Sequence, residues 1–169
     1  MDTAVRQLVL LRHAKSAWPD VSDHERPLAP RGQRDAPEAG RWLRESGYVP
    51  DQVLSSTARR TRETWQLVQR ELGAEPPVTF HDVLYGAEVQ DVLELVQATP
   101  DSVTRLLVVG HEPTMSETTL HLAGQGAGDA LARVLTKFST CAIAVLALPG
   151  AWAEVAEASG TLTEFRTPR

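Results

Sequence analysis

The chain has 169 residues, a hydrophobic fraction of 42% and a formal net charge of −5. This length suits one domain with its own core, and the acidic charge argues against broad binding to nucleic acid or to acidic membranes. An anion-binding site in this chain must therefore be a local concentration of positive charge, and the single cysteine, Cys141, excludes an internal disulfide framework.

Strand and helix patterns alternate along the chain. In chain order, they predict a strand at 7–12, a polar loop to about residue 30, a helix at 32–45, a strand at 52–54, a helix at 58–72, a strand at 78–80, a helix at 89–97, a strand at 105–110, helices at 114–123 and 127–135, and strands at 141–148 and 152–158. The pair Pro149–Gly150 predicts a turn between the last two strands. The expected fold class is α/β: a single three-layer domain over residues 1–169, with a mostly parallel central sheet, helices on both faces and an antiparallel edge hairpin.

The first predicted strand ends in a group of polar and positive residues. The apolar run 8–11 is typical of a buried parallel strand, and it is followed by Arg12, His13, Lys15 and Ser16. Ligands bind at the carboxyl ends of such strands, so these residues indicate an anion site. The alternative is that they only mark where a strand meets water. Only two of the 17 basic residues are lysines, Lys15 and Lys137. Lysine is a compact point charge and arginine a planar fork, so the two are not interchangeable at a phosphate. A lysine within the first motif therefore favours a functional role for Lys15.

A second strand repeats this pattern, because the apolar run 106–109 leads through Gly110 to His111. Pro113 stands where the first turn of a helix is expected, so His111 lies between a strand end and a helix N-terminus. Both positions favour an anion. A lone histidine here would more often be structural, but two histidines at equivalent strand ends favour a functional site.

A third group follows the strand at 52–54, where hydroxyl residues 55–57 are candidate N-caps for the next helix. Arg59, Arg60 and Arg62 occupy the first turns of that helix. Neighbouring helix positions point about 100° apart, so at most one or two of these arginines can face the sheet edge. The alternative is a solvated basic helix face that pairs with Glu63.

Taken together, these segments resemble the histidine phosphatase superfamily, which has the phosphoglycerate-mutase-like fold, and in particular its short SixA-like phosphohistidine phosphatases. The matches run in order across nearly the whole chain. They are Arg12-His13-Ala14-Lys15-Ser16 with Trp18, Arg26-Pro27-Leu28, Arg31-Gly32, Ser55-Ser56 with Arg60 and Thr64, Val109-Gly110-His111-Glu112-Pro113, and Lys137-Phe138 with Thr140.

The resemblance implies that His13 is a nucleophile that carries a transient phosphoryl group. A backbone carbonyl on the other ring nitrogen would fix the tautomer that attack requires. It also implies that Arg12, Arg60 and His111 surround the phosphoryl oxygens. The choice of Arg60 over Arg59 rests on the resemblance.

Three further residues would lie at the rim of such a site: Lys15 as a phosphate contact, with Ser16 and Arg31 beside it.

The general acid is the least defined part of the pattern. Relatives place a glutamate before an aromatic–glycine pair, and Asp82 occupies the comparable place before Tyr85 and Gly86. Glu88 is the alternative, and either carboxylate could be a solvated surface group. A phosphate ester needs a proton on its leaving alkoxide, whereas phosphohistidine has a labile N–P bond. We therefore hypothesise that a weak or missing acid favours N–P substrates.

The resemblance implies a phosphatase that hydrolyses a phosphomonoester or phosphohistidine through a covalent intermediate on His13, with phosphohistidine in proteins as the expected substrate. The expected partner is a phosphorylated protein or a small phosphorylated metabolite. His13 and His111 with a carboxylate could bind a metal, but Arg12 and Arg60 oppose a divalent cation, so we expect no metal and no cofactor. The alternatives are a non-catalytic phosphoanion-binding module and a small-molecule phosphatase or phosphoglycerate-mutase-like enzyme. We expect neither nucleic acid nor membrane as a partner. With no secretory signal and only a short apolar run at 141–148, the expected location is cytoplasmic.

Overall fold

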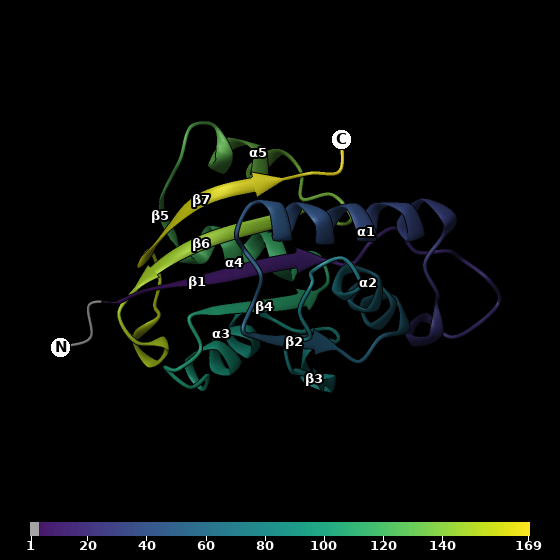
Figure 1. Ribbon diagram of the computed structural model, residues 1–169, viewed down its shortest axis with the longest axis horizontal. Coiled ribbons are helices and arrows are strands. Elements are labelled where there is room, and N and C mark those ends of the chain that lie inside the picture. The colour runs from purple at the N-terminus through teal and green to yellow at the C-terminus, as the bar shows by residue number, and fades with distance from the viewer. Residues whose placement is uncertain (1–3) are drawn as a thin grey trace.

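The computed structural model describes residues 4–169, and alternating strands and helices make up most of that length (Figure 1). The elements are β1 (Val5–Arg12), α1 (Pro30–Glu45), β2 (Gln52–Ser56), α2 (Arg59–Gln69), β3 (Val78–His81), α3 (Val89–Gln97), β4 (Arg105–Gly110), α4 (Thr114–Leu122), β5 (Ala123–Gly126), α5 (Ala130–Thr136), β6 (Ile143–Pro149) and β7 (Gly160–Arg166). Short 3₁₀ helices are η1 (Asp23–Glu25), η2 (Asp82–Leu84) and η3 (Trp152–Glu154). None of the helices within residues 4–169 is both long and apolar enough to cross a bilayer.

The strands form one seven-stranded sheet in the order β3-β2-β4-β1-β6-β7-β5. Strands β3, β2, β4 and β1 are parallel to one another, and β6 is antiparallel to both of its neighbours, β1 and β7. In the central pair, Arg12 at the end of β1 is in register with Gly110 at the end of β4. The residues that follow, His13 and His111, therefore leave the sheet side by side.

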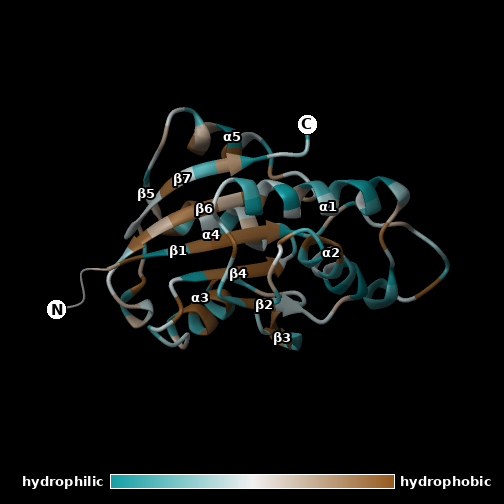
Figure 2. Ribbon diagram, viewed as in Figure 1, coloured by the Kyte–Doolittle hydropathy of each residue, from teal (hydrophilic) through white to brown (hydrophobic). Residues whose placement is uncertain are grey.

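Helices cover both faces of the sheet, which confirms the predicted α/β class with three layers. Helices α1 and α2 pack on one face, and α3, α4 and α5 on the other (Figure 1). Along β1 the side chains alternate between the two cores: Leu8 and Leu10 face the second helix layer, and Val9 and Leu11 face the first. All four are fully buried, so the continuous apolar run is that of a strand covered on both sides (Figure 2).

The prediction for the last two strands is right in their pairing and wrong in their position. Residues 152–158 are not a strand, because Trp152 begins a 3₁₀ helix, is fully buried and donates its indole N–H to the Val103 carbonyl at 2.8 Å. Strand β7 lies instead at Gly160–Arg166 and pairs antiparallel with β6. A ten-residue connection at 150–159, rather than a tight turn at Pro149–Gly150, therefore joins the two strands.

The edge of the sheet also differs from the prediction. Ala123–Gly126 forms the short strand β5, which pairs parallel with β7, so the β6–β7 pair does not end the sheet. The helix expected at 127–135 begins later, at Ala130. The glycine-rich sequence explains why β5 was missed: it has little side-chain pattern, and at Gly124 a Cβ would lie 2.4 Å from the Ala158 carbonyl oxygen.

The predicted caps of α2 are corrected as well. Its N-cap is Ala58, without a side-chain cap hydrogen bond, while Ser55 and Ser56 belong to β2. Pairing between β2 and β4 continues as far as Ser55 opposite Val109, and β2 pairs with β3 as far as Ser56 opposite His81, so both serines belong to the strand. Ser56 still accepts a hydrogen bond from the Ala58 N–H at 3.2 Å through its Oγ.

Candidate active site at the carboxyl edge of the sheet

The carboxyl ends of β1, β4 and β2 bring Arg12, His13 and His111 to one pocket, together with Arg60 from α2. Its volume is about 190 Å³, and its lining residues are Arg12, His13, Lys15, Ser16, Trp18, Arg26, Arg60, His111, Glu112 and Thr140. The His13 N–H donates to the Gly110 carbonyl at 3.1 Å, which continues the β1–β4 ladder one step beyond the strands. The ring centroids of His13 and His111 lie 5.3 Å apart.

The imidazole of His13 is buried and held in one orientation. Its Nδ1 lies 2.7 Å from the Ala14 carbonyl oxygen, and since a carbonyl only accepts, Nδ1 carries the proton and the lone pair is on Nε2. The Ala14 N–H in turn donates to Thr64 Oγ1 at 3.0 Å. Burial lowers the pKa of His13 to about 3, with further lowering by the positive groups around it. The ring is therefore neutral at physiological pH, as a nucleophile must be.

His111 stands on the opposite wall, with its Nε2 2.8 Å from Ser56 Oγ. Burial is the main cause that lowers the pKa of His111 to about 4, and the nearby Arg60 guanidinium lowers it further. The ring of Tyr85 packs edge-on at 5.6 Å between centroids. His111 is thus a neutral hydrogen-bonding group in a positively charged pocket.

Two arginines supply the positive charge beside the histidines. Arg12 donates through Nη1 to the Phe138 carbonyl at 2.9 Å, and its buried Nε has no hydrogen-bond partner among residues 4–169. Burial lowers the pKa of Arg12, although an arginine stays charged at neutral pH. Arg60 projects from the first turn of α2 and is only 7% exposed. Buried guanidinium groups with spare donors are suited to binding an oxyanion.

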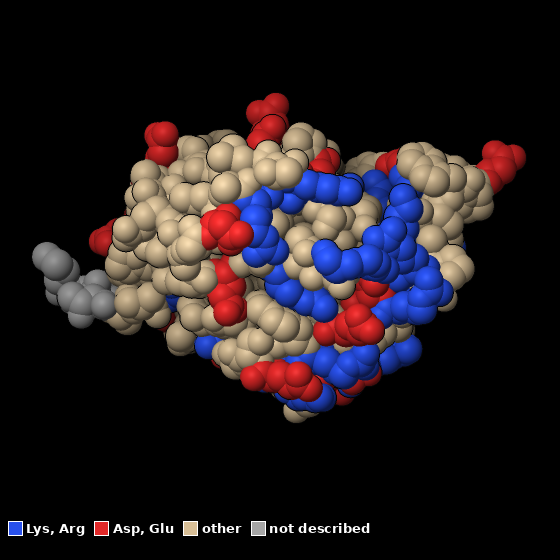
Figure 3. All heavy atoms as spheres, turned by 90° about the horizontal axis from the view of Figure 1, so that it is seen from above, with Lys and Arg blue, Asp and Glu red and all other residues tan. Residues whose placement is uncertain are grey.

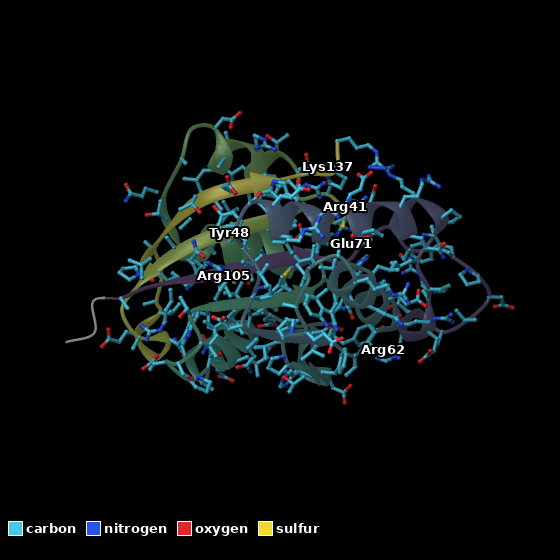
Figure 4. All side chains as sticks on the ribbon, viewed as in Figure 1. Arg41, Tyr48, Arg62, Glu71, Arg105 and Lys137 are labelled. Atoms are coloured by element: carbon cyan, nitrogen blue, oxygen red, sulfur yellow. The ribbon has the colours of Figure 1, made fainter. Side chains whose placement is uncertain are left out.

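The helix geometry separates Arg60 from its neighbours, as the 100° spacing predicts. Arg59 is paired with Glu63 at 2.8 Å on the surface of α2. Arg62 donates to the Thr57 carbonyl at 2.9 Å and points away from the sheet (Figure 4). Of the three arginines, Arg60 is the one that lines the pocket.

Asp23 organises Arg60, and sequence reasoning did not identify it. Its Oδ2 accepts from Arg60 Nη2 at 3.1 Å and from the Tyr85 hydroxyl at 2.5 Å, and its Oδ1 accepts from Arg26 Nη1 at 2.9 Å. The Asp23 carbonyl accepts from Arg60 Nη1 at 2.8 Å. These hydrogen bonds, that of Tyr85 foremost, hold the pKa of Asp23 well below its usual range. Asp23 lies in a polar loop without periodicity, so only its nearness in sequence to Arg26 hinted at this role.

Arg26 fixes the loop that forms the outer wall of the pocket. Its guanidinium donates to Ser16 Oγ and to the Ala17 carbonyl, and it is 7% exposed. The Trp18 ring covers it, with the guanidinium carbon 3.3 Å from the ring centroid. Trp18 itself is 77% exposed and forms part of the pocket mouth.

The two carboxylates considered for general acid lie elsewhere. Asp82 accepts a hydrogen bond from Thr57 Oγ1 at 2.8 Å and does not line the pocket. Glu88 caps α3 in a capping box with Asp91. The carboxylate that does line the pocket is Glu112, whose Oε1 accepts from the Ser116 N–H at 2.7 Å. Lys15, by contrast, lines the pocket and is exposed to solvent.

Comparison with known proteins matches this arrangement. A sequence profile of the histidine phosphatase superfamily (branch 1) matches residues 8–88. An uncharacterized protein of Mycobacterium tuberculosis is 46% identical over 94% of this chain and all of its own length. The solved structure of a protein assigned as phosphohistidine phosphatase SixA from Nakamurella multipartitia has a TM-score of 0.86 and 37% identity, covering 99% of both chains.

A further solved structure is that of the protein histidine phosphatase SixA complexed with tungstate, with a TM-score of 0.79 and 25% identity over 96% of this chain and 97% of that one. The likeness therefore extends over the whole sheet and over both helix layers, and includes every segment that lines the pocket. The chain belongs to the histidine phosphatase superfamily and is SixA-like within it.

Proposed function

We propose that this chain hydrolyses phosphohistidine in proteins through a covalent phosphoryl intermediate on His13. The observation that carries the proposal is the state of the His13 ring: buried, neutral, and fixed by the Ala14 carbonyl so that the lone pair is on Nε2. The same ring lies beside Arg12, Arg60 and His111. A nucleophile and three groups for phosphoryl oxygens thus share one small pocket.

In the first step, Nε2 of His13 attacks phosphorus and forms a new P–N bond. The P–N bond of the substrate breaks, and its electron pair goes to the substrate imidazole nitrogen. A phosphohistidine that is protonated on its other ring nitrogen thus leaves as neutral imidazole, and the enzyme need not supply a proton. Nδ1–H of His13 keeps its hydrogen bond to the Ala14 carbonyl, which stabilises the positive ring of the intermediate. In the second step, water attacks phosphorus and Nε2 leaves with its electron pair, giving inorganic phosphate and free enzyme.

Arg12, Arg60 and His111 bind the phosphoryl oxygens in both steps. Guanidinium groups place fixed positive charge where the transition state gathers negative charge. Because these arginines supply that charge, and because they repel a divalent cation, we propose that the reaction needs no metal or other cofactor.

The carboxylates around the pocket support an N–P substrate. Asp82 and Glu88 are engaged away from the pocket, and Glu112 is held by the Ser116 N–H. An alkoxide leaving group needs a strong proton donor, whereas a phosphorylated imidazole leaves as a neutral ring once protonated. Similarity to proteins described as phosphohistidine phosphatases supports the same substrate class.

The test is hydrolysis of p-nitrophenyl phosphate with and without a chelator, by the wild type and by His13→Ala. We expect chelator-resistant activity that falls by more than about 10³-fold in the variant. Activity that survives the substitution would refute the mechanism. Turnover of a phosphohistidine peptide should also exceed turnover of a phosphoserine peptide, and equal rates would contradict the proposed substrate class.

A further inference from the structure

A second, positively charged pocket adjoins the catalytic one. It has a volume of about 270 Å³, and it is lined by three cationic side chains, which we call the basic shelf: Arg31, Lys137 and Arg169. The hydroxyl residues Ser139, Thr140 and Thr167 also line it. Thr140 is shared with the catalytic pocket, so a ligand bound by His13 can extend directly over the shelf.

The shelf is fixed to the catalytic residues on both of its sides. On one side, the segment that carries Lys137 is held by the hydrogen bond from Arg12 to the next residue, Phe138. On the other side, the start of α1, which carries Arg31, rests on the backbone of Lys15. The Ala29 N–H donates to the Lys15 carbonyl at 2.9 Å, and a Cβ at position 32 would lie 2.2 Å from the same oxygen. The backbone segments that carry Arg31 and Lys137 are therefore anchored to the segments around His13.

Positive charge on the shelf exceeds what the surrounding residues neutralise. The buried carboxylate of Asp35 pairs with Arg169 at 2.9 Å and lies 3.7 Å from Arg31. No hydrogen bond or ion pair within residues 4–169 engages the side chain of Lys137 or that of Lys15. Both lysines of the chain thus stand free around Thr140.

The pictures agree with this charge distribution. Lys137 lies beside the C-terminal end of β7, on the side of the molecule that α1 and α5 also occupy (Figure 4). On that side, Lys and Arg side chains form an arc around a hollow, and Asp and Glu side chains lie mainly outside it (Figure 3). In a chain with a net charge of −5, this is a local concentration of positive charge next to the catalytic pocket.

We propose that the basic shelf binds acidic side chains of the phosphorylated protein, next to the histidine that carries the phosphoryl group. This inference rests on the proposed function and adds a preference for carboxylates beside the phosphohistidine. A phosphoryl group bound by Arg12 and His13 places neighbouring residues of the substrate across Thr140, within reach of Lys137 and Arg31. The contacts are solvent-exposed, so each adds a modest attraction that salt weakens.

The test compares two phosphohistidine peptides that differ only in the residues flanking the histidine: Asp and Glu in one, Asn and Gln in the other. The readout is the ratio of their kcat/KM values, in which a general loss of activity cancels. With two carboxylate–cation contacts, we expect the wild type to favour the acidic peptide about tenfold at low salt, and less at high salt.

The variants assign this preference to the shelf. Lys137→Gln should lower the ratio about threefold, and Lys137→Arg should keep it, because the charge remains. Arg70→Gln is the matched control: Arg70 is an exposed cation just after α2 that lines a different pocket, so the ratio should not change. Equal kcat/KM values in the wild type, or equal losses in Lys137→Gln and Arg70→Gln, would overturn the proposal.

A binding assay separates failure of the shelf from failure of the proposed function. Fluorescence anisotropy would follow fluorescein-labelled versions of the same two peptides without the phosphoryl group. Preferential binding of the acidic peptide that depends on Lys137 supports the shelf, even if neither phosphopeptide is hydrolysed. Hydrolysis of both phosphopeptides together with equal binding of the two labelled peptides would refute the shelf and leave the proposed function standing.

Discussion

Replacement of His13 by Asn should change how the stability of the protein depends on pH. In the folded protein, burial lowers the pKa of His13 to about 3, whereas an exposed histidine has a pKa of about 6.5. Below about pH 6.5 the unfolded chain therefore binds a proton that the folded protein does not. The free energy of unfolding of the wild type consequently falls as the pH drops from about 6.5 towards 3.

The size of this effect follows from the two pKa values of His13. At pH 5 the folded ring stays neutral, and the unfolded ring is almost fully protonated. The linkage relation then gives a loss of about 2 kcal/mol relative to pH 7.5. A variant without this ring lacks the His13 contribution, whereas the contribution of His111, whose pKa is also lowered, remains in both proteins and cancels in their difference. The difference in unfolding free energy between wild type and His13→Asn should therefore shift by about 2 kcal/mol, against the wild type, between the two pH values.

Urea unfolding at pH 7.5 and pH 5 measures this shift. The packing that the substitution removes has the same cost at both pH values, so it cancels in the double difference. His13→Gln serves as the control for side-chain shape and should give the same shift as His13→Asn. A double difference near zero would refute the reasoning, because it would mean that the folded protein binds the proton on His13. The neutral nucleophile of the proposed mechanism would then be lost as well.

Three further changes test other contacts. Arg60→Ala should lower kcat/KM for p-nitrophenyl phosphate by about 10²–10³-fold, as loss of a group that binds the transition state does; a change under tenfold would exclude Arg60 from that role. Asp23→Asn weakens the contacts to Arg60 and Tyr85 and should lower kcat/KM about tenfold with little change in the urea midpoint, whereas a large loss of stability would make Asp23 mainly structural. Gly32→Ala places a Cβ 2.2 Å from the Lys15 carbonyl oxygen, so urea unfolding should show a loss of about 2 kcal/mol or more; an unchanged midpoint would contradict this close packing.

The sequence allowed prediction of those site residues whose positions depend on local patterns, namely strand ends and helix spacing. An apolar run followed by a polar residue marks a strand end, and two such runs place His13 and His111 at one edge of a parallel sheet. The register of Arg12 opposite Gly110 then makes them neighbours. The spacing of helix positions limited how many arginines could face the pocket, although it did not choose among them.

The parts that depend on distant contacts could not be predicted. Asp23 matters because Arg60 and Tyr85, from two distant segments, converge on its carboxylate beside the neighbouring Arg26, and no periodicity records such convergence. The same holds for the position of strand β7. It depends on the burial of Trp152, a residue of the connection between β6 and β7. Asp82 was chosen by its place in a family pattern, but the local 3₁₀ helix η2 directs it to Thr57.

Capture of the phosphoryl intermediate shows directly whether His13 is the nucleophile. The wild type would be mixed with a radiolabelled phosphoryl donor, such as labelled phosphohistidine peptide, quenched in alkali, and digested to locate the label. We expect an adduct on His13 that is stable in alkali, labile in acid and absent from His13→Ala. A label on another residue, or turnover by His13→Ala at the wild-type rate, would contradict it.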